Sequence, residues 1–221
     1  MKLYHFTTKE NLASILERGI LTGKTPYQDL LDFPAVSLSS VPDSDGLGLI
    51  RGETLIESRD REFIVAANHY PMGVTKTKDG IRQVRMFDQS EVMLVVDLSV
   101  SSSKLFSHQK LFNKILRKNI MADRSKSELA YWNAAIIHST EHPFGTSHLN
   151  QSEIEEGRKK MLRSNALRRA DSWYFYTDII PVKKIVGVYE KAGDGGYSQM
   201  ELAHACRPGK VVFKMPNRVA T

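Results

Sequence analysis

Cysteine is nearly absent from this chain, since Cys206 is the only one among 221 residues. A single cysteine excludes a disulfide within the chain and a zinc cluster built on several cysteines. No run of about 18 apolar residues occurs, and so we expect no transmembrane helix. The first residues enter a strand-like pattern with no basic and then apolar leader before it. These absences favour a cytoplasmic protein that does not act in a membrane.

The common signatures of nucleotide and metal sites are also missing. The sequence contains no Walker phosphate loop, no GxGxxG fingerprint and no HExxH zinc motif. His138, His142 and His148 come nearest to a metal-binding set, but Pro143 and Gly145 predict a loop rather than the helix that such spacing needs. We therefore predict no metal site.

Positive charge is modest overall but unevenly placed. The chain has 31 Lys and Arg against 25 Asp and Glu, a net charge of +6, and the excess gathers in residues 104–126 and 157–170. Two basic clusters can bind a polyanion, although solvated helix faces explain them equally well. The nucleic-acid-binding candidates in these segments are Lys114, Arg117, Lys118, Arg158, Lys159, Lys160 and Arg163.

Hydrophobic periodicity, caps and turn residues predict an α+β protein. The expected strands are 2–6, 35–40, 81–87, 91–98, 172–180, 183–190 and 210–215. The expected helices are the stretch from an N-cap at Thr8 to Gly19, and the segments 104–121, 126–138 and 152–169, the last with Ser152 as N-cap. No linker divides the chain, and so we expect one domain over 1–221, in which 102–170 could form a helical insertion.

The stretch YHFTTKENLASILERGI, residues 4–20, sets a histidine into the first strand, just before a threonine and the start of a helix. It resembles the opening of ADP-ribosyltransferase-fold proteins. It is most similar to the DarT-type enzymes that modify single-stranded DNA, and more distantly to RNA 2′-phosphotransferases. AVSLSSVPDSDG, residues 35–46, is similar to the second strand and loop of many such proteins. The resemblance implies a split mixed sheet with surrounding helices, and NAD as co-substrate.

By this resemblance, His5, Phe6 and Thr7 would bind NAD, with His5 and the Thr7 region contacting the adenosine-side ribose and the nicotinamide amide. An imidazole can hydrogen-bond a ribose hydroxyl while the backbone holds its other nitrogen. A buried strand histidine bonded to a carbonyl is the alternative. Arg51 is the first candidate for the pyrophosphate, because the guanidinium fork matches phosphate oxygens. Tyr27 could stack on the nicotinamide.

The segment ADSWYFYTDIIPVKKIVGVY, residues 170–189, is similar to the strand, turn and final strand around the family's catalytic glutamate, but that glutamate's position falls near Ser172 or Trp173. Cleavage of the nicotinamide–ribose bond builds positive charge on the ribose, which a carboxylate can stabilise. Glu91, which opens the strand EVMLVVDL, is therefore our first candidate for the catalytic acid, with His5 as the second catalytic residue. The other candidate acids are Glu128, Glu141, Glu190 and Glu201.

The sequence therefore predicts an NAD-dependent ADP-ribosyltransferase that acts on nucleic acid, DNA rather than RNA, or on a protein. Two alternatives remain open. The fold could be kept as a non-catalytic module that binds nucleic acid, NAD or ADP-ribose, or the protein could catalyse a 2′-phosphotransferase-like reaction on RNA. The sequence leaves open the oligomeric state and whether the protein is a toxin, a phage-defence factor or a viral counter-measure.

Overall fold

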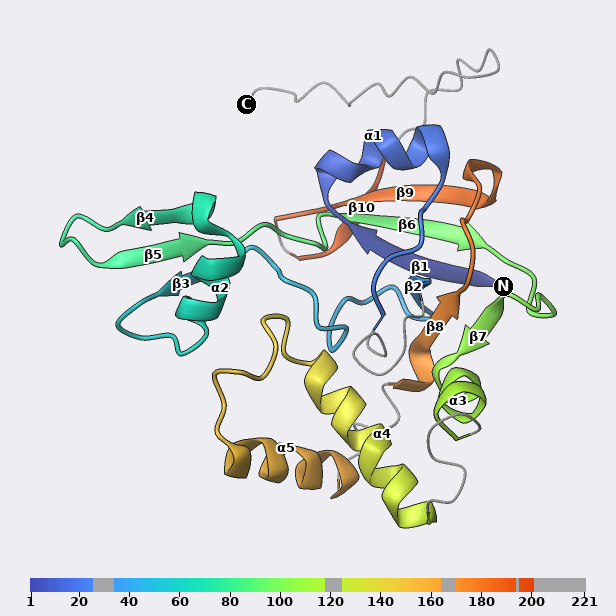
Figure 1. Ribbon diagram of the computed structural model, residues 1–221. Coiled ribbons are helices and arrows are strands. Elements are labelled where there is room, and N and C mark those ends of the chain that lie inside the picture. The colour runs from blue at the N-terminus through green and yellow to red at the C-terminus, as the bar shows by residue number, and fades with distance from the viewer. Residues whose placement is uncertain (26–33, 118–124, 164–169, 194, 201–221) are drawn as a thin grey trace. The chain divides into compact units, whose positions relative to one another are not determined.

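The computed structural model describes residues 1–25, 34–117, 125–163, 170–193 and 195–200 (Figure 1). Its contacts divide the chain into two compact units. Unit 1 comprises residues 1–43, 90–107 and 173–221, and unit 2 comprises 44–89 and 108–172. Strands and helices alternate with long connections, and the predicted α+β class is confirmed.

Unit 1 is built on a seven-stranded sheet in the order β10-β9-β6-β1-β2-β8-β7. Its strands are β1 (Lys2–Thr7), β2 (Val36–Ser39), β6 (Val92–Asp97), β7 (Leu105–Ser107), β8 (Trp173–Tyr176), β9 (Ile185–Lys191) and β10 (Tyr197–Gln199). Each neighbouring pair is antiparallel, where we expected a mixed sheet. Strand β6 lies between β9 and β1 and is buried from Val92 to Val96, as a run of β-branched and aliphatic residues favours.

Helix α1 (Lys9–Arg18) packs Leu12, Ile15 and Leu16 onto one face of this sheet (Figure 1). Its predicted limits are confirmed, because Thr8 is the N-cap in an extended conformation and Gly19 is the C-cap. Gly19 has φ 89° and ψ 177°, a region that is essentially restricted to glycine. Directly after it, Ile20 forms a two-bond bridge with Ile180 that ties the end of the helix to the chain before β9.

Unit 2 contains a three-stranded antiparallel sheet in the order β3-β5-β4. The strands are β3 (Thr54–Ile56), β4 (Val74–Lys76) and β5 (Arg82–Arg85), and helix α2 (Phe63–His69) follows β3. A short 3-10 turn, η1 (Pro71–Gly73), leads into β4. The small core of this part gathers Phe63 and Ala66 from α2 with Val84 and Met86. Most of 49–80 had no interpretation from the sequence, because the elements there are only three to seven residues long.

The other described elements of unit 2 are helices and 3-10 turns. They comprise α3 (His108–Leu111), the π-helix η2 (Phe112–Arg117), α4 (Lys126–Thr140), α5 (Gln151–Arg163) and the 3-10 turn η3 (Ala170–Ser172). A third 3-10 turn, η4 (Val182–Lys184), belongs to unit 1. Helix α4 begins with a capping box in which Ser125 and Glu128 each accept the other's backbone N–H.

Two helix predictions need correction. The expected helix over 104–121 opens instead with strand β7, because Leu105–Ser107 extends the sheet by pairing with β8. Pairing with a neighbouring strand outweighs local helical periodicity here. Helix α5 begins at Gln151 rather than after Ser152. Asn150 and Glu153 exchange side-chain and backbone hydrogen bonds at its start, so Asn150 fills the capping role that we gave to Ser152.

The strands expected over 2–6, 35–40, 81–87, 91–98, 172–180 and 183–190 are present within a few residues as β1, β2, β5, β6, β8 and β9, and the helix expected over 126–138 is confirmed. Strands β3, β4 and β10 were not predicted. The strand expected over 210–215 lies outside the described residues. Among the described helices, none is long and apolar enough to cross a membrane.

Candidate functional site

His5 lies in the middle of β1 and is held by the neighbouring strand. Its Nδ1 is 3.0 Å from the backbone carbonyl oxygen of Ser37 in β2. A carbonyl can only accept, and so Nδ1 carries the hydrogen of this bond. Desolvation lowers the pKa of His5, an effect that the Ser37 bond partly opposes. The neutral ring therefore presents Nε2 as an acceptor, and Nε2 has no protein partner among the described residues.

The register of three strands places His5 and Thr7 on the face that α1 covers. His5 pairs with Leu94, which in turn pairs with Val188, and the next row along is Thr7, Val92 and Glu190. Directly opposed residues of an antiparallel pair point to the same face. The hydroxyl of Thr7 accepts a bond of 3.4 Å from the Asn11 amide. The face thus joins an imidazole, a hydroxyl and the Glu190 carboxylate near one end of the strands.

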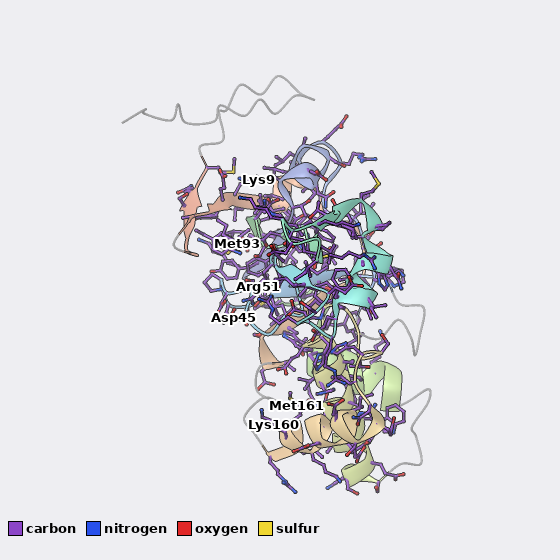
Figure 2. The ribbon with its side chains drawn as sticks, turned by 90° about the vertical axis from the view of Figure 1, so that its left-hand side faces the viewer. Lys9, Asp45, Arg51, Met93, Lys160 and Met161 are labelled. Carbon is purple, nitrogen blue, oxygen red and sulfur yellow. The ribbon has the colours of Figure 1, made fainter. Side chains whose placement is uncertain are left out.

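Lys9, the first residue of α1, is labelled in Figure 2. Both Glu91 and Glu190 interact with it. The backbone N–H of Lys9 donates to Glu91 Oε2 at 2.9 Å, while the Lys9 ammonium pairs with Glu190. The side chain of Thr8 makes no capping bond. Glu91 therefore caps α1 from a distant part of the sequence, and its negative charge lies at the positive end of the helix dipole.

Replacing Glu91 by alanine is expected to lower the free energy of unfolding by about 1 kcal/mol, because an N-terminal N–H of α1 loses its acceptor. Glu91→Gln keeps an acceptor oxygen, and we expect a smaller loss. The matched control is Glu10→Ala, which removes an exposed carboxylate from the same helical turn. Urea unfolding followed by circular dichroism measures all three. Equal stability of Glu91→Ala and Glu10→Ala would contradict the capping role.

The other predicted NAD ligands are dispersed. Phe6 is buried on the opposite face from His5, with its ring centroid 6.0 Å from that of Tyr197. Arg51 belongs to unit 2, where its guanidinium pairs with Asp45, as Figure 2 shows. Tyr27 lies outside the described residues, as does Glu201.

The basic candidates on α5 differ in exposure. Lys159, Lys160 and Arg163 are exposed, and neither Lys160 nor Arg163 has an ion-pair partner among the described residues. Lys160 contrasts with its neighbour Met161, which is buried (Figure 2). Arg158 is partly buried, with its guanidinium 5.6 Å above the ring of Tyr131.

A surface hollow runs along α5 and is lined by Gln151, Ser152, Glu155, Glu156, Lys159, Lys160 and Arg163. Acidic residues line its first half and basic residues its second, an order that also complements the helix dipole. Lys114 is exposed in η2, whereas the side chain of Arg117 and all of Lys118 lie outside the description. The basic end of α5, formed by Lys159, Lys160 and Arg163, is therefore the part of the predicted basic clusters that the structure describes best.

The sequence pointed to His5, Glu91 and Glu190 as candidates, but it did not reveal the residues that they contact. Ser37 contributes a backbone carbonyl, which no side-chain pattern can reveal. The approach of Lys9 to Glu190 depends on the pairing of β6 with β9, which joins residues far apart in the chain. The sequence predicts a strand over most of β9, but it does not reveal which strand lies beside it in the sheet.

The chemistry available within unit 1 is that of a neutral hydrogen-bond acceptor, a hydroxyl and two carboxylates. Within the described part of the chain, no group of three His, Cys, Asp or Glu side chains is placed to hold a metal ion.

No family model matches the chain, and no curated protein or solved structure matches it.

Proposed function

We propose that the protein is an NAD-dependent ADP-ribosyltransferase of the ADP-ribosyltransferase fold that modifies nucleic acid, with single-stranded DNA preferred. The observation that carries the proposal is the state of His5, whose Nδ1–H is engaged by Ser37 and whose neutral ring leaves Nε2 as an acceptor. A ribose hydroxyl of NAD can donate to such a nitrogen. The motif around His5 supports NAD as the ligand by its resemblance to that superfamily.

A carboxylate would serve the reaction by stabilising positive charge on the ribose as nicotinamide leaves. Glu91 directly precedes β6 and lies three residues before Leu94, the partner of His5, which is roughly 10 Å at the usual strand rise. An extended dinucleotide can span that separation. Glu91 is our first candidate for this acid, and the acceptor nucleotide would have to approach the same end of the strands.

The test is incubation of the full chain with NAD labelled in its adenosine, in separate reactions with single-stranded DNA, RNA and total protein. We expect label on the DNA and release of nicotinamide. Label on protein alone would refute the nucleic-acid acceptor, and absence of both transfer and nicotinamide release would refute the transferase.

A second candidate function, a non-catalytic module that binds NAD or nucleic acid, is favoured by one contact. Glu91 Oε2 already accepts the N–H of Lys9, so this carboxylate has a structural role that explains its presence without catalysis. The binding module predicts a measurable affinity for NAD or DNA with no nicotinamide release under any condition. The variant Glu91→Gln distinguishes the transferase from the binding module. In both cases it should leave NAD binding intact, and if the protein is a transferase it should abolish the transfer that the wild type shows.

The basic end of α5 leads to a salt-dependence prediction. The double variant Lys160→Glu/Arg163→Glu should weaken single-stranded DNA binding and lower the slope of log affinity against log salt by about 1.4, if each side chain neutralises one phosphate. The control is Lys183→Glu/Lys184→Glu, which makes the same change of charge at exposed residues of unit 1. Fluorescence anisotropy over a salt series measures both slopes. Equal slopes for the two double variants would exclude a specific role for α5.

A further inference from the structure

Three histidines that the proposed reaction does not use form a cluster within unit 2. His138 lies in the last turn of α4, His142 lies just after that helix, and His148 lies in the loop before α5. The ring centroids of His138 and His142 are 4.8 Å apart, and those of His142 and His148 are 5.6 Å apart. The interplanar angles are 61° and 62°, so each pair meets edge to face.

His148 is the most enclosed of the three. Its side chain is only 3% exposed, and neither of its ring nitrogens makes a hydrogen bond within the described residues. The carboxylate of Glu62 is the facing charged group, with Oε1 3.3 Å from Nε2. A buried imidazole without hydrogen bonds is an unusual and costly arrangement, because buried polar groups are normally paired.

Helix α5 rests directly on this cluster. A Cβ added to Gly157 would lie 2.0 Å from Nε2 of His138, so α5 approaches this ring as closely as a glycine allows. The next residue, Arg158, donates to the hydroxyl of Tyr131 at 3.1 Å, and its Nε is buried without a hydrogen-bond partner. Tyr131 in turn donates to Glu155. A proton on His138 would therefore place a second positive charge beside that of Arg158, where α5 packs tightly against α4.

The surroundings disfavour protonation of two members. Desolvation, followed by the neighbouring His142 and Arg158, lowers the pKa of His138. Desolvation and then His148 lower the pKa of His142, although Glu141 and Glu62 act in the opposite direction. Histidines whose pKa is lower in the folded state than in the unfolded chain stabilise the fold above about pH 6.5, and this contribution is lost as the pH falls below that value.

We propose that the histidine cluster is a pH-sensitive latch of unit 2, in which protonation separates helix α5 and the loop 141–150 from α4. The proposal does not depend on the transferase function. A second interaction, between Arg61 and Glu153, also holds this loop, and its charge state does not change between pH 6.5 and pH 5.5. Arg61 bonds Glu153 at 2.6 and 3.0 Å and the His148 carbonyl at 2.7 Å, and the bond from Arg61 lowers the pKa of Glu153 to about 2. That pair therefore stays charged at pH 5.5.

Hydrogen exchange of the full chain, corrected for the intrinsic pH dependence of exchange, tests the latch. Between pH 6.5 and pH 5.5 the opening constant of amides in α5 should rise by up to about tenfold for each histidine that is kept neutral in the folded state. Amides of β6 in unit 1 provide the internal comparison. An equal change in both units, or none in α5, would overturn the proposal.

Two variants separate the latch from general acid sensitivity. His142→Gln removes a half-exposed ring and its charge from the cluster, and should reduce the pH response of α5 by up to about tenfold per pH unit. His69→Gln is the matched control, because this exposed histidine of α2 bonds only the Val65 carbonyl. The same response in both variants would contradict the proposal. A wild-type response that disappears after chelation would also overturn it, since the cluster would then be holding a metal ion rather than protons.

Discussion

The variant His5→Ala is expected to bind NAD about 10- to 100-fold more weakly than the wild type and to show no detectable transfer. The expected loss corresponds to about 1–3 kcal/mol, the usual cost when a buried polar partner is left without its hydrogen bond. In the proposed complex the donor would be a ribose hydroxyl of NAD, and the acceptor lost in the variant would be Nε2 of His5. Isothermal titration measures binding, and nicotinamide release measures turnover.

The control for this variant is His69→Gln, which removes an exposed imidazole elsewhere in the chain. Thermal unfolding of both variants establishes whether unit 1 remains folded, because His5 also bonds Ser37. His5→Gln provides a second comparison, since its amide can replace part of the hydrogen bonding. An NAD affinity of folded His5→Ala equal to that of wild type would exclude His5 from the site.

The neutral state of His5 also predicts how the affinity for NAD depends on pH. Because desolvation lowers its pKa, the ring stays neutral down to pH values below the ordinary range for histidine. The affinity for NAD should therefore change little between pH 7.5 and pH 6.5. It should fall at lower pH, when Nε2 gains a proton and changes from acceptor to donor.

The variant Gly19→Ala is expected to lose about 2–5 kcal/mol in the free energy of unfolding, the largest stability effect that we predict. The backbone at Gly19, with φ 89°, disfavours any residue with a Cβ. An added Cβ would also lie 2.4 Å from the carbonyl oxygen of Ile180. That oxygen accepts the N–H of Ile20, so relief of the clash breaks the bridge that fixes the end of α1.

Gly23→Ala is the matched control, because a Cβ there has no neighbour within 4 Å and the backbone has no positive φ. We expect a change within about 1 kcal/mol, in the direction of stabilisation, since alanine restricts the unfolded chain. Urea denaturation monitored by circular dichroism compares the two variants. A loss of less than about 1 kcal/mol in the free energy of unfolding of Gly19→Ala would contradict the prediction. It would mean that the backbone at the end of α1 can move to accommodate a Cβ without cost.

The sequence was most informative where structure is local. Helix α1, its Thr8 and Gly19 caps and the capping-box helix α4 follow from neighbouring residues, and the alternation and apolar runs of β1, β6 and β8 predict strands. His5 was selected by its motif, and its bond to Ser37 is compatible with both interpretations of it, an NAD ligand held by the backbone and a buried strand histidine bonded to a carbonyl.

The errors and omissions have a common physical source, which is contact between distant residues. The pairing of Leu105 with Tyr176 turns a helical pattern into strand β7. The bond of Glu91 to Lys9 spans 82 residues, and it gives a capping role to a side chain that the sequence suggested as an acid. Pro143 and Gly145 predict a loop after His142, and the sequence did not predict that this loop brings the rings of the three clustered histidines together.

The state of His5 in the presence of NAD is the most direct test of the proposed function. Nitrogen NMR of the histidine side chains reports whether each ring nitrogen is protonated, and the spectrum of His5→Gln identifies the His5 signals among the seven histidines. At pH 7.5 we predict a protonated Nδ1 and an unprotonated Nε2, and a shift of the Nε2 signal when NAD is added. A protonated Nε2, or signals that NAD leaves unchanged at millimolar concentration, would contradict the assignment of His5 to an NAD site.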